Sequence, residues 1–586
     1  MNKKNDKNKK KQALALVGSA WLAIISLAIV VFAAPLSRAQ PANPAATSGA
    51  TSGNPSSATP GPSRRSDQLP NLGDGSDMTT SAERRMGDRI AREIYRDPDY
   101  IDDPVLAEYV QGIWQPLLAA ARLRGELNAE LDERFAWEIM MGKDRSVNAF
   151  ALPGGYFGLH LGLVAIVTSR DELASVLGHE LSHVTQRHIS RLIAKQSAQA
   201  PWMIGAMILG ALAASKSPNA ANALIVGGQA VAAQNQLNFS RDMEREADRI
   251  GFGVMTQAGF EPYGFVSMFE KLQQASRLND NGSFPYLRSH PRTTERISDM
   301  QARVPLGPRT GLQRGAEPGA PPGMAGTPAP MGKPGTPGTV APGEDMEQAM
   351  IAARANVLSN PGVDALRAWG PLAASPGLGS QAPARQAAAL YGATLAAIRL
   401  RDLPGALALQ ARLAAVVQAD TPAAKTAQSD ARAARLAHLL AAEVALAAND
   451  ASKAVALMES KNALPGRPEM MLLSQALVRT GQASQAGLAV QQLQTWVANN
   501  PRDAQAWQLL SSAYAAQGQS LRAIRADAEA QVAHLDYAGA LDRFKAAQEL
   551  ARDLSRKGNA DHIEASIIDA RARQTALLLK EQSVER

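Results

Sequence analysis

The segment LGHELSHV, residues 177–184, carries the chemistry from which the fold is inferred. His179 and His183 are four residues apart, so on a helix both imidazoles lie on one face and can reach one metal ion. Glu180 is one position further round, where it can take a proton from a water molecule. Residues 172–177 lack proline and are apolar on one side, which predicts a helix leading into the motif. Because so short a pattern also arises by chance, the surrounding sequence must show whether it forms a metal site.

A catalytic zinc site needs a third protein ligand. His188 is one candidate, but the extended metzincin pattern fails because the glycine and histidine it requires are absent. The segment FSRDMEREAD, residues 239–248, is a better candidate, since Glu244 and Asp248 are one helical turn apart. One carboxylate can complete the zinc shell while the other hydrogen-bonds a histidine ligand from outside. The alternative is a solvated helix face, and the neighbouring histidine motif makes ligation the better interpretation.

Composition excludes several classes of protein. The 586 residues contain no cysteine, which rules out a disulfide framework, a thiolate metal site and a cysteine nucleophile. The formal charge is +7, but residues 1–39 hold seven Lys or Arg against one Asp, a net of +6, which leaves about +1 elsewhere. A nearly neutral remainder gives no electrostatic reason to bind nucleic acid.

The N-terminus has the pattern of an export signal. Within residues 1–39, a lysine-rich start is followed by an apolar run and by small residues suited to cleavage after Ala39. The run is also long enough to be an uncleaved membrane anchor. Either version sends the rest of the chain across the membrane, into the periplasm. Residues 40–68 contain no large apolar side chain and are predicted to be a disordered tether.

A second composition break divides the remainder of the chain. Residues 303–345 hold ten Pro and ten Gly among 43 residues, which predicts a flexible linker between the blocks 69–302 and 346–586. The second block is rich in Ala, Leu, Gln and Arg, with helix–turn–helix units whose turns are expected at 401–403, 449–450, 518 and 536–537. This pattern is similar to degenerate tetratricopeptide repeats, an α-solenoid with a concave docking surface. A non-repetitive helical bundle is the alternative.

Three stretches of the first block together resemble a known family. The histidine motif, the string SRDMEREAD at 240–248 and the segment VNAFALPGG at 147–155 are similar to the M48 family of zinc peptidases. The resemblance covers residues 69–302 strongly and the second block by architecture alone. It implies a mainly α domain with a small β-sheet, an α+β fold of the zincin type, followed by the helical repeats.

The resemblance also implies roles for the motif residues. One Zn²⁺ per chain would be held by His179, His183 and Glu244, with Glu180 as the catalytic base and Asp248 supporting a ligand from outside. The exported address then indicates a zinc metalloendopeptidase of the periplasm.

Two further segments receive roles from the same resemblance. Asn148, Ala149 and Phe150 would lie on an edge strand that pairs with the substrate backbone, although the glycine pair at 154–155 also fits an ordinary hairpin. His290, which precedes a proline, would take the fourth position on zinc as a latch; the alternative is a surface histidine at a helix start.

Residues further from the motif complete the expected site. Arg296 would support an oxyanion or the loop beside it. Residues 201–233 form two apolar arms, 201–214 and 220–233, each too short to span a bilayer. We expect a helical hairpin that covers the active-site groove and makes peripheral contact with membrane or with unfolded barrel strands.

The sequence therefore predicts an exported endopeptidase that cleaves unfolded or misassembled proteins, since strand pairing needs a free substrate backbone. The resemblance implies quality control and assembly of outer-membrane proteins, with the barrel-assembly machinery as a partner of the helical repeats. It also implies a chaperone-like role in assembling the lipopolysaccharide transporter. Two alternatives stay open: a periplasmic chaperone or scaffold with a latched, rarely active zinc site, and a structural repeat protein with a chance motif.

Overall fold

The computed structural model describes most of both predicted blocks, namely residues 78–195, 240–278, 286, 290, 294–304, 345–419, 427–460 and 466–584. All of these residues belong to one compact unit, Leu72–Arg586. The predicted signal or anchor, the tether, the two apolar arms and residues 305–344 of the predicted linker lie outside the described ranges. Within those ranges, no helix combines the length and apolar character needed to cross a membrane.

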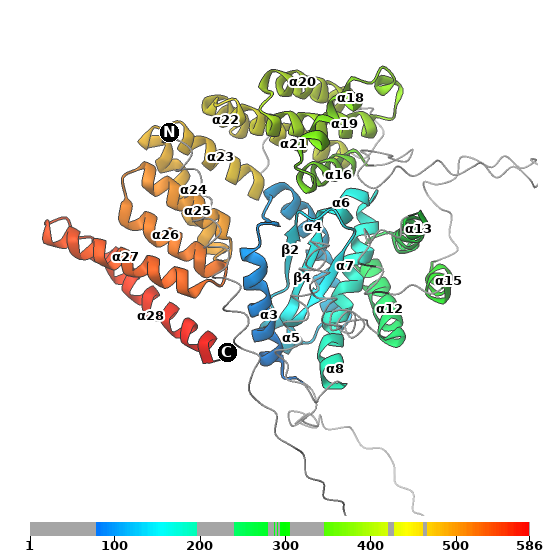
Figure 1. Ribbon diagram of the computed structural model, residues 1–586, viewed down its shortest axis with the longest axis horizontal. Coiled ribbons are helices and arrows are strands. Elements are labelled where there is room, and N and C mark those ends of the chain that lie inside the picture. Colours follow the sequence, from blue (N-terminus) through cyan, green and yellow to red (C-terminus); the bar gives the residue numbers. More distant parts are fainter. Residues whose placement is uncertain are drawn as a thin grey trace, which may run out of the picture. The chain divides into compact units, whose positions relative to one another are not determined.

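The first block consists of helices around a small sheet (Figure 1). Its elements are α3 (Thr80–Arg96), β1 (Tyr100–Ile101), α4 (Pro104–Leu123), α5 (Ala129–Arg134), β2 (Glu138–Gly142), β3 (Ala149–Leu152), η1 (Pro153–Gly155), β4 (Tyr156–His160), α6 (Leu161–Ile166), α7 (Arg170–Thr185), α8 (His188–Lys195), α12 (Arg241–Gln257), α13 (Tyr263–Leu278) and α15 (Thr294–Arg303). The predicted fold class, mainly α with a small β-sheet, is confirmed for this block.

The sheet is mixed, in the order β1-β2-β4-β3. β2 and β4 are parallel, while β1 and β3 pair antiparallel with them, so β3 forms one edge of the sheet. The turn η1 returns the chain from β3 to β4 with φ of 73° at Gly154 and 79° at Gly155. A Cβ on Gly154 would lie 2.7 Å from the Cα of Arg84, so this turn requires glycine both for its backbone conformation and for space.

Helix α7 is the central helix of the first block. Every residue from Glu172 to Thr185 is buried, and the helix contacts α4, α12, α13 and β3. Its N-terminus is capped by Ser169, whose hydroxyl accepts a hydrogen bond from the N–H of Glu172. Ser240 caps α12 in the same way.

The two helices α7 and α12 cross where two glycines meet. A Cβ built on Gly251 of α12 would lie only 2.9 Å from the backbone C and O atoms of Gly178 on α7. The absence of side chains at both positions lets the helix backbones touch. Because Gly178 immediately precedes His179, this contact fixes the histidine motif against α12.

The second block is wholly helical in its described parts. Its elements are α16 (Met346–Ser359), α17 (Val363–Arg367), α18 (Trp369–Ala374), η2 (Leu378–Ser380), α19 (Pro383–Leu400), α20 (Leu403–Ala419), α21 (Ala427–Ala447), α22 (Ala451–Met458), α23 (Arg467–Arg479), α24 (Ala483–Asn499), α25 (Ala504–Ala516), α26 (Ser520–Ala533), α27 (Tyr537–Arg556) and α28 (His562–Val584). From α19 to α28, each helix contacts the next along the chain.

Turns in the second block lie where the sequence places them. Residues with positive φ angles follow four of these helices, namely Arg401 after α19, Asn449 after α21, Gly518 after α25 and Leu535 after α26. The helix–turn–helix organisation therefore agrees with the expected pattern, whereas the assignment of these pairs as tetratricopeptide repeats stays a prediction.

Charged groups join the second block to the N-terminal end of α4. Arg354 of α16 lies within 2.7 Å of Asp103 and 2.9 Å of Glu443, and all but 4% of its surface is buried. In the same region Arg467 of α23 lies 2.7 Å from Asp102. Since Asp103 also caps α4, these ion pairs attach the helical block to an element that contacts α7.

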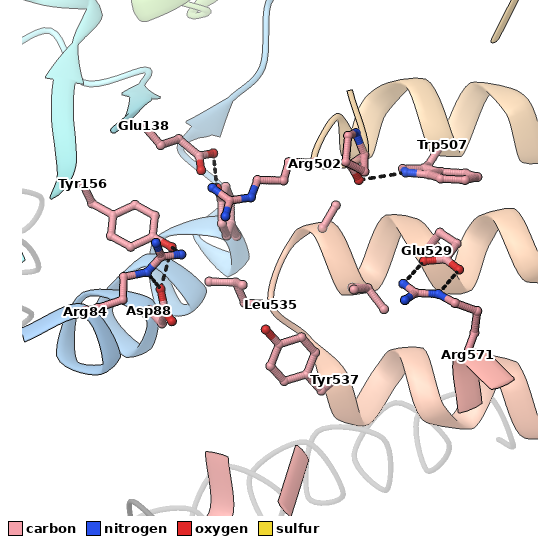
Figure 2. A pocket seen from close by; sticks show the side chains of 14 residues that line it. Arg84, Asp88, Glu138, Tyr156, Arg502, Trp507, Glu529, Leu535, Tyr537 and Arg571 are labelled. Carbon is pink, nitrogen blue, oxygen red and sulfur yellow. Dashed lines mark hydrogen bonds and ion pairs between the residues drawn. The ribbon is translucent and has the colours of Figure 1, made fainter. Parts of the chain in front are cut away.

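A cavity of about 390 Å³ lies between the two blocks and is lined by residues of both (Figure 2). Its walls come from α3, β2 and β4 on one side and from residues 501–571 on the other. Two of its arginines are already paired, Arg84 with Asp88 at 2.6 Å and Arg571 with Glu529 at 2.6 Å. The residues of the histidine motif do not line it.

Candidate metal centre

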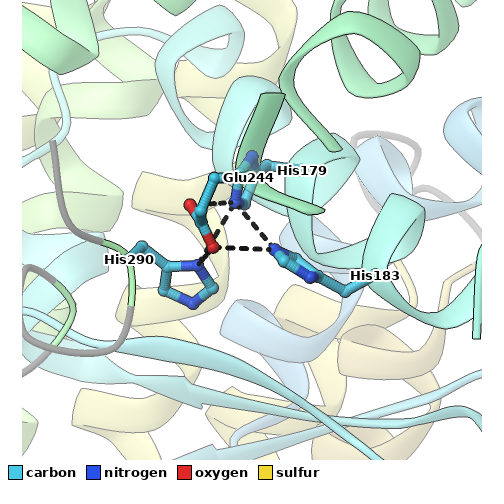
Figure 3. Close-up of side chains that lie close together, drawn as sticks. All are labelled: His179, His183, Glu244 and His290. Carbon is cyan, nitrogen blue, oxygen red and sulfur yellow. Dashed lines mark hydrogen bonds and ion pairs between the residues drawn. The ribbon is translucent and has the colours of Figure 1, made fainter. Parts of the chain in front are cut away.

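Four buried side chains from three parts of the first block converge on one point (Figure 3). They are His179 and His183 of α7, Glu244 of α12, and His290, and one ligand atom from each lies within 4.8 Å of the others. The Nε2 atoms of His179 and His183 are 3.0 Å apart. The predicted spacing thus places both imidazoles on one helix face, and α12 brings the carboxylate to them.

Distances within this cluster match a tetrahedral metal site. Four donors bound at ~2.05 Å to a tetrahedral zinc ion are about 3.3 Å from one another. Glu244 lies 3.6 Å from His179 Nε2 through Oε2 and 3.5 Å from His183 Nε2 through Oε1. His290 Nδ1 lies 3.0 Å from Glu244 Oε1 and 3.3 Å from His179 Nε2. The donor set and its spacing therefore fit one metal ion.

The carboxylates of Glu244 and Asp248 stabilise a positive charge within this cluster. Burial opposes protonation of His179, but Asp248 and Glu244 overcome it and raise the pKa of His179 to about 9. Burial likewise disfavours an ionised Glu244, yet His290 and His179 hold its pKa well below the usual range. In His183, burial and then the neighbouring His179 lower the pKa far below its ordinary value. A divalent cation would satisfy the same electrostatic demand that otherwise protonates His179.

A second carboxylate and an arginine support the cluster from behind. Asp248 Oδ1 lies 3.0 Å from His179 Nδ1, the nitrogen that faces away from the other ligands. Arg296 bonds both oxygens of Asp248, at 2.6 and 2.8 Å, and its Nη1 lies 2.7 Å from Glu244. Arg296 is buried between these two carboxylates. Its guanidinium is thus engaged with the ligand shell, and its expected role in supporting an oxyanion or the loop stays a prediction.

Glu180 lies beside the cluster and faces the sheet edge. Its Oε2 accepts a hydrogen bond of 3.0 Å from the N–H of Ala151 in β3, and its Oε1 lies 3.5 Å from His290 Nε2. Among the described residues, no group donates a hydrogen bond to the buried Oε1. Burial raises the pKa of Glu180 in spite of the two neighbouring histidines. A buried carboxylate whose pKa is raised in this way is suited to accept a proton and to return it.

The predicted substrate strand is at the edge of the sheet nearest this carboxylate. Ala149 and Phe150 belong to β3, and Asn148 directly precedes it. The ring of Phe150 packs over Gly158 of β4, where any Cβ would collide with it. Since the N–H of Ala151 points to Glu180, the outer edge of β3 faces the metal cluster.

Three contacts at the site were not assigned from the sequence. Tyr286 stacks on the imidazole of His290, with ring centroids 4.7 Å apart. His188 Nδ1 lies 2.9 Å from His183 Nδ1, and His188 Nε2 lies 3.0 Å from Glu246. Burial lowers the pKa of His188 despite the nearby carboxylate. The only signal in the sequence was its position five residues after the motif.

A helix with two histidines and a glutamate base, completed by a carboxylate from a second helix, defines a metal centre of the metallopeptidase type. Residues 108–304 match the family model described as Peptidase family M48. The chain therefore contains an M48 peptidase domain, as the motifs predict.

Known proteins similar to this chain include bacterial and mitochondrial peptidases. The putative beta-barrel assembly-enhancing protease of Vibrio cholerae is 36% identical over 239 residues, which cover 40% of this chain and 47% of that protein. The beta-barrel assembly-enhancing protease of Escherichia coli is 32% identical over 244 residues, covering 41% and 47%. Mitochondrial metalloendopeptidase OMA1 of Saccharomyces cerevisiae is 27% identical over 201 residues, covering 33% and 55%. The similarity thus spans about half the length of these relatives.

Proposed function

We propose that this chain is an exported zinc endopeptidase that cleaves unfolded or misassembled proteins during outer-membrane protein assembly. The observation that carries the proposal is the buried cluster of His179, His183 and Glu244 with Glu180 beside it. The names of the bacterial relatives, which refer to β-barrel assembly, support the cellular role. Their export and location in the periplasm come to this chain as part of the proposal.

Zinc would be held by His179, His183 and Glu244, and Asp248 would hold the ring of His179 in place. When bound, the ion supplies Lewis acidity that polarises the scissile carbonyl and lowers the pKa of water. Glu180 receives the proton lost by the attacking water and passes it to the leaving amine. Burial suits Glu180 to both steps, because it raises the pKa of this carboxyl group and so favours the acid form that gives the proton back.

Substrate would add as a further strand along β3. The edge strand can pair with an extended backbone, and its hydrogen bonds do not depend on substrate side chains. A peptide paired with β3 would pass beside Glu180, which already contacts the N–H of Ala151. This arrangement favours unfolded segments over folded proteins as substrates.

His290 would act as a latch on this site. Its Nδ1 lies 3.0 Å from Glu244 and its Nε2 faces Glu180 at 3.5 Å, so its ring stands between the ligand carboxylate and the base. Catalytic zinc needs an open or exchangeable position, so His290 must move before a substrate carbonyl can approach. The same geometry favours the second candidate function, a chaperone or scaffold in which the latch rarely opens.

Cleavage of casein by the full-length protein distinguishes these functions. In a peptidase, Glu180→Gln abolishes cleavage while zinc content stays unchanged, and His290→Ala increases cleavage several-fold. If zinc is present and no form of the protein cleaves casein, the peptidase proposal is wrong and the scaffold is favoured.

Partner binding belongs to the second block in this proposal. The second block, residues 346–586, would dock the barrel-assembly machinery, as solenoids of helix pairs commonly bind proteins. Peripheral membrane contact would come from the apolar arms between α8 and α12.

A further inference from the structure

We propose that His188 is a positioning residue that fixes the ring orientation and tautomer of the metal ligand His183. This inference rests on the proposed zinc site, and it gives His183 a support through Nδ1, as Asp248 gives to His179. The supporting chain runs from His183 through His188 to Glu246, and Arg191 contacts the same oxygen of Glu246 at 3.0 Å.

The backbone between α7 and α8 is built to bring His188 under the motif helix. Arg187 has φ of 52°, a left-handed conformation that is unfavourable for a residue with a side chain. Its guanidinium is held by Glu83 at 3.0 Å and also contacts the carbonyl of Met78. This reversal turns His188 back against His183 and leaves its side chain fully buried.

Hydrogen-bond chemistry then determines the position of each proton. An ionised Glu246 only accepts hydrogen bonds, so Nε2 of His188 must carry the proton donated to it. The two Nδ1 atoms of His188 and His183 are 2.9 Å apart, so one of them must accept; with its proton on Nε2, His188 accepts the Nδ1–H of His183. The lone pair of His183 is then on Nε2, the atom that faces His179 and Glu244. Reversing either tautomer would place a proton on Nε2 of His183 and block ligation.

His179 is supported in an equivalent but shorter way. Its Nδ1 contacts Asp248 directly, and Arg296 holds that carboxylate. Each histidine ligand thus ends in a carboxylate from α12 with an arginine behind it. The series of hydrogen bonds from His183 contains one more imidazole and ends at Glu246 and Arg191, whose side chains are partly exposed.

Zinc affinity of the full-length protein, measured by competition with a chromophoric chelator, tests the role of His188. His188→Leu removes the acceptor, and we expect zinc affinity to fall about 10–100-fold. His188→Asn can place an amide oxygen near the former Nδ1, so it should retain affinity within a few-fold of the wild type. His188→Gln extends towards Glu246 instead and should resemble the leucine variant. His438→Leu is the control and should bind zinc normally, because it removes an imidazole of α21 that bonds the backbone carbonyl of Leu457 in α22.

Two further readouts separate positioning from loss of structure. The visible spectrum of the cobalt-substituted protein should change in His188→Leu and be restored in His188→Asn, while thermal unfolding of the metal-free forms identifies any variant that fails to fold. Equal zinc affinity in the wild type and His188→Leu, or equal loss in the Asn and Gln variants, would overturn the inference while leaving the zinc site intact. Failure of the wild type itself to bind zinc would overturn both the site and the inference.

Discussion

Replacing Gly251 by alanine should separate the two helices that carry the proposed zinc ligands. The new Cβ would lie 2.9 Å from backbone atoms of Gly178. Ordinary carbon contacts are about 3.5 Å or longer, so α12 must move away from α7 by roughly half an ångström. Neither neighbouring atom belongs to a flexible side chain, and the strain therefore cannot be relieved by a rotamer change.

This displacement has consequences for stability and for metal binding. Overpacking of this kind costs about 1–3 kcal/mol, partly offset by the ~1 kcal/mol that alanine gains over glycine within a helix. Metal–ligand distances tolerate deviations of only about 0.2 Å, so moving Glu244 with α12 exceeds that tolerance. We expect zinc affinity to fall about tenfold or more, the scale seen when the support of a ligand is lost.

Gly253→Ala is the matched control on the same helix. Its Cβ would meet only the guanidinium of Arg124, at 2.5 Å, and that side chain is one-third exposed and can swing aside. Thermal unfolding of both metal-free variants and chelator competition of both zinc-bound forms give the comparison. Gly253→Ala should equal or exceed the wild type in both measurements. If Gly251→Ala matched it, the close helix contact would not position the site.

Three other perturbations test different parts of the molecule. Arg354→Met would leave the carboxylates of Asp103 and Glu443 buried without their cation, so the free energy of unfolding measured with urea should fall by about 3–5 kcal/mol, and a loss below 1 kcal/mol would contradict this. Burial favours protonation of Asp503, but Arg467 holds the pKa of this carboxyl group below its usual value. The pair therefore stabilises the fold above about pH 4, and this stabilisation is lost as the pH falls through the lowered pKa. In Asp503→Asn, the free energy of unfolding should consequently depend less steeply on pH in the acid range. Removing zinc with a chelator should lower the Tm of the wild type and leave the Tm of His183→Ala unchanged. If free zinc had been at 100 times Kd, the free energy of unfolding of the wild type should fall by about 2.7 kcal/mol.

The candidate ligands could be predicted because their arrangement depends on local geometry. Residues four apart on a helix share a face whatever the fold, and this applies both to the histidines of α7 and to Glu244 and Asp248 of α12. That the two helices meet was suggested by resemblance to a family, and the structure supplies the physical cause in the glycines at their crossing.

Other features depended on contacts that no local pattern contains. The position of His188 follows from a left-handed residue at Arg187, whose conformation is held by Glu83 more than 100 positions away. The ion pair between Asp103 and Arg354 joins residues 251 positions apart. The placement of Arg296 between Glu244 and Asp248 likewise depends on contacts about 50 positions away in the sequence.

In the helical block too, local features could be predicted from the sequence and long-range contacts could not. Turn residues such as Asn449 and Gly518 could be recognised because they must adopt positive φ at helix ends. The sequence does not show which helix faces contact the first block, because arginines that form ion pairs, such as Arg435 and Arg467, look the same in sequence as solvated arginines. Arg435 in fact lies 2.6 Å from Glu469 within the block and also contacts Glu108 of α4.

Zinc content and casein cleavage of the full-length protein, compared with Glu180→Gln, test the central claim most directly. The cluster predicts one zinc per chain in both proteins, with cleavage by the wild type and none by the variant. Absence of zinc from the wild type, or equal cleavage by both proteins, would contradict the account.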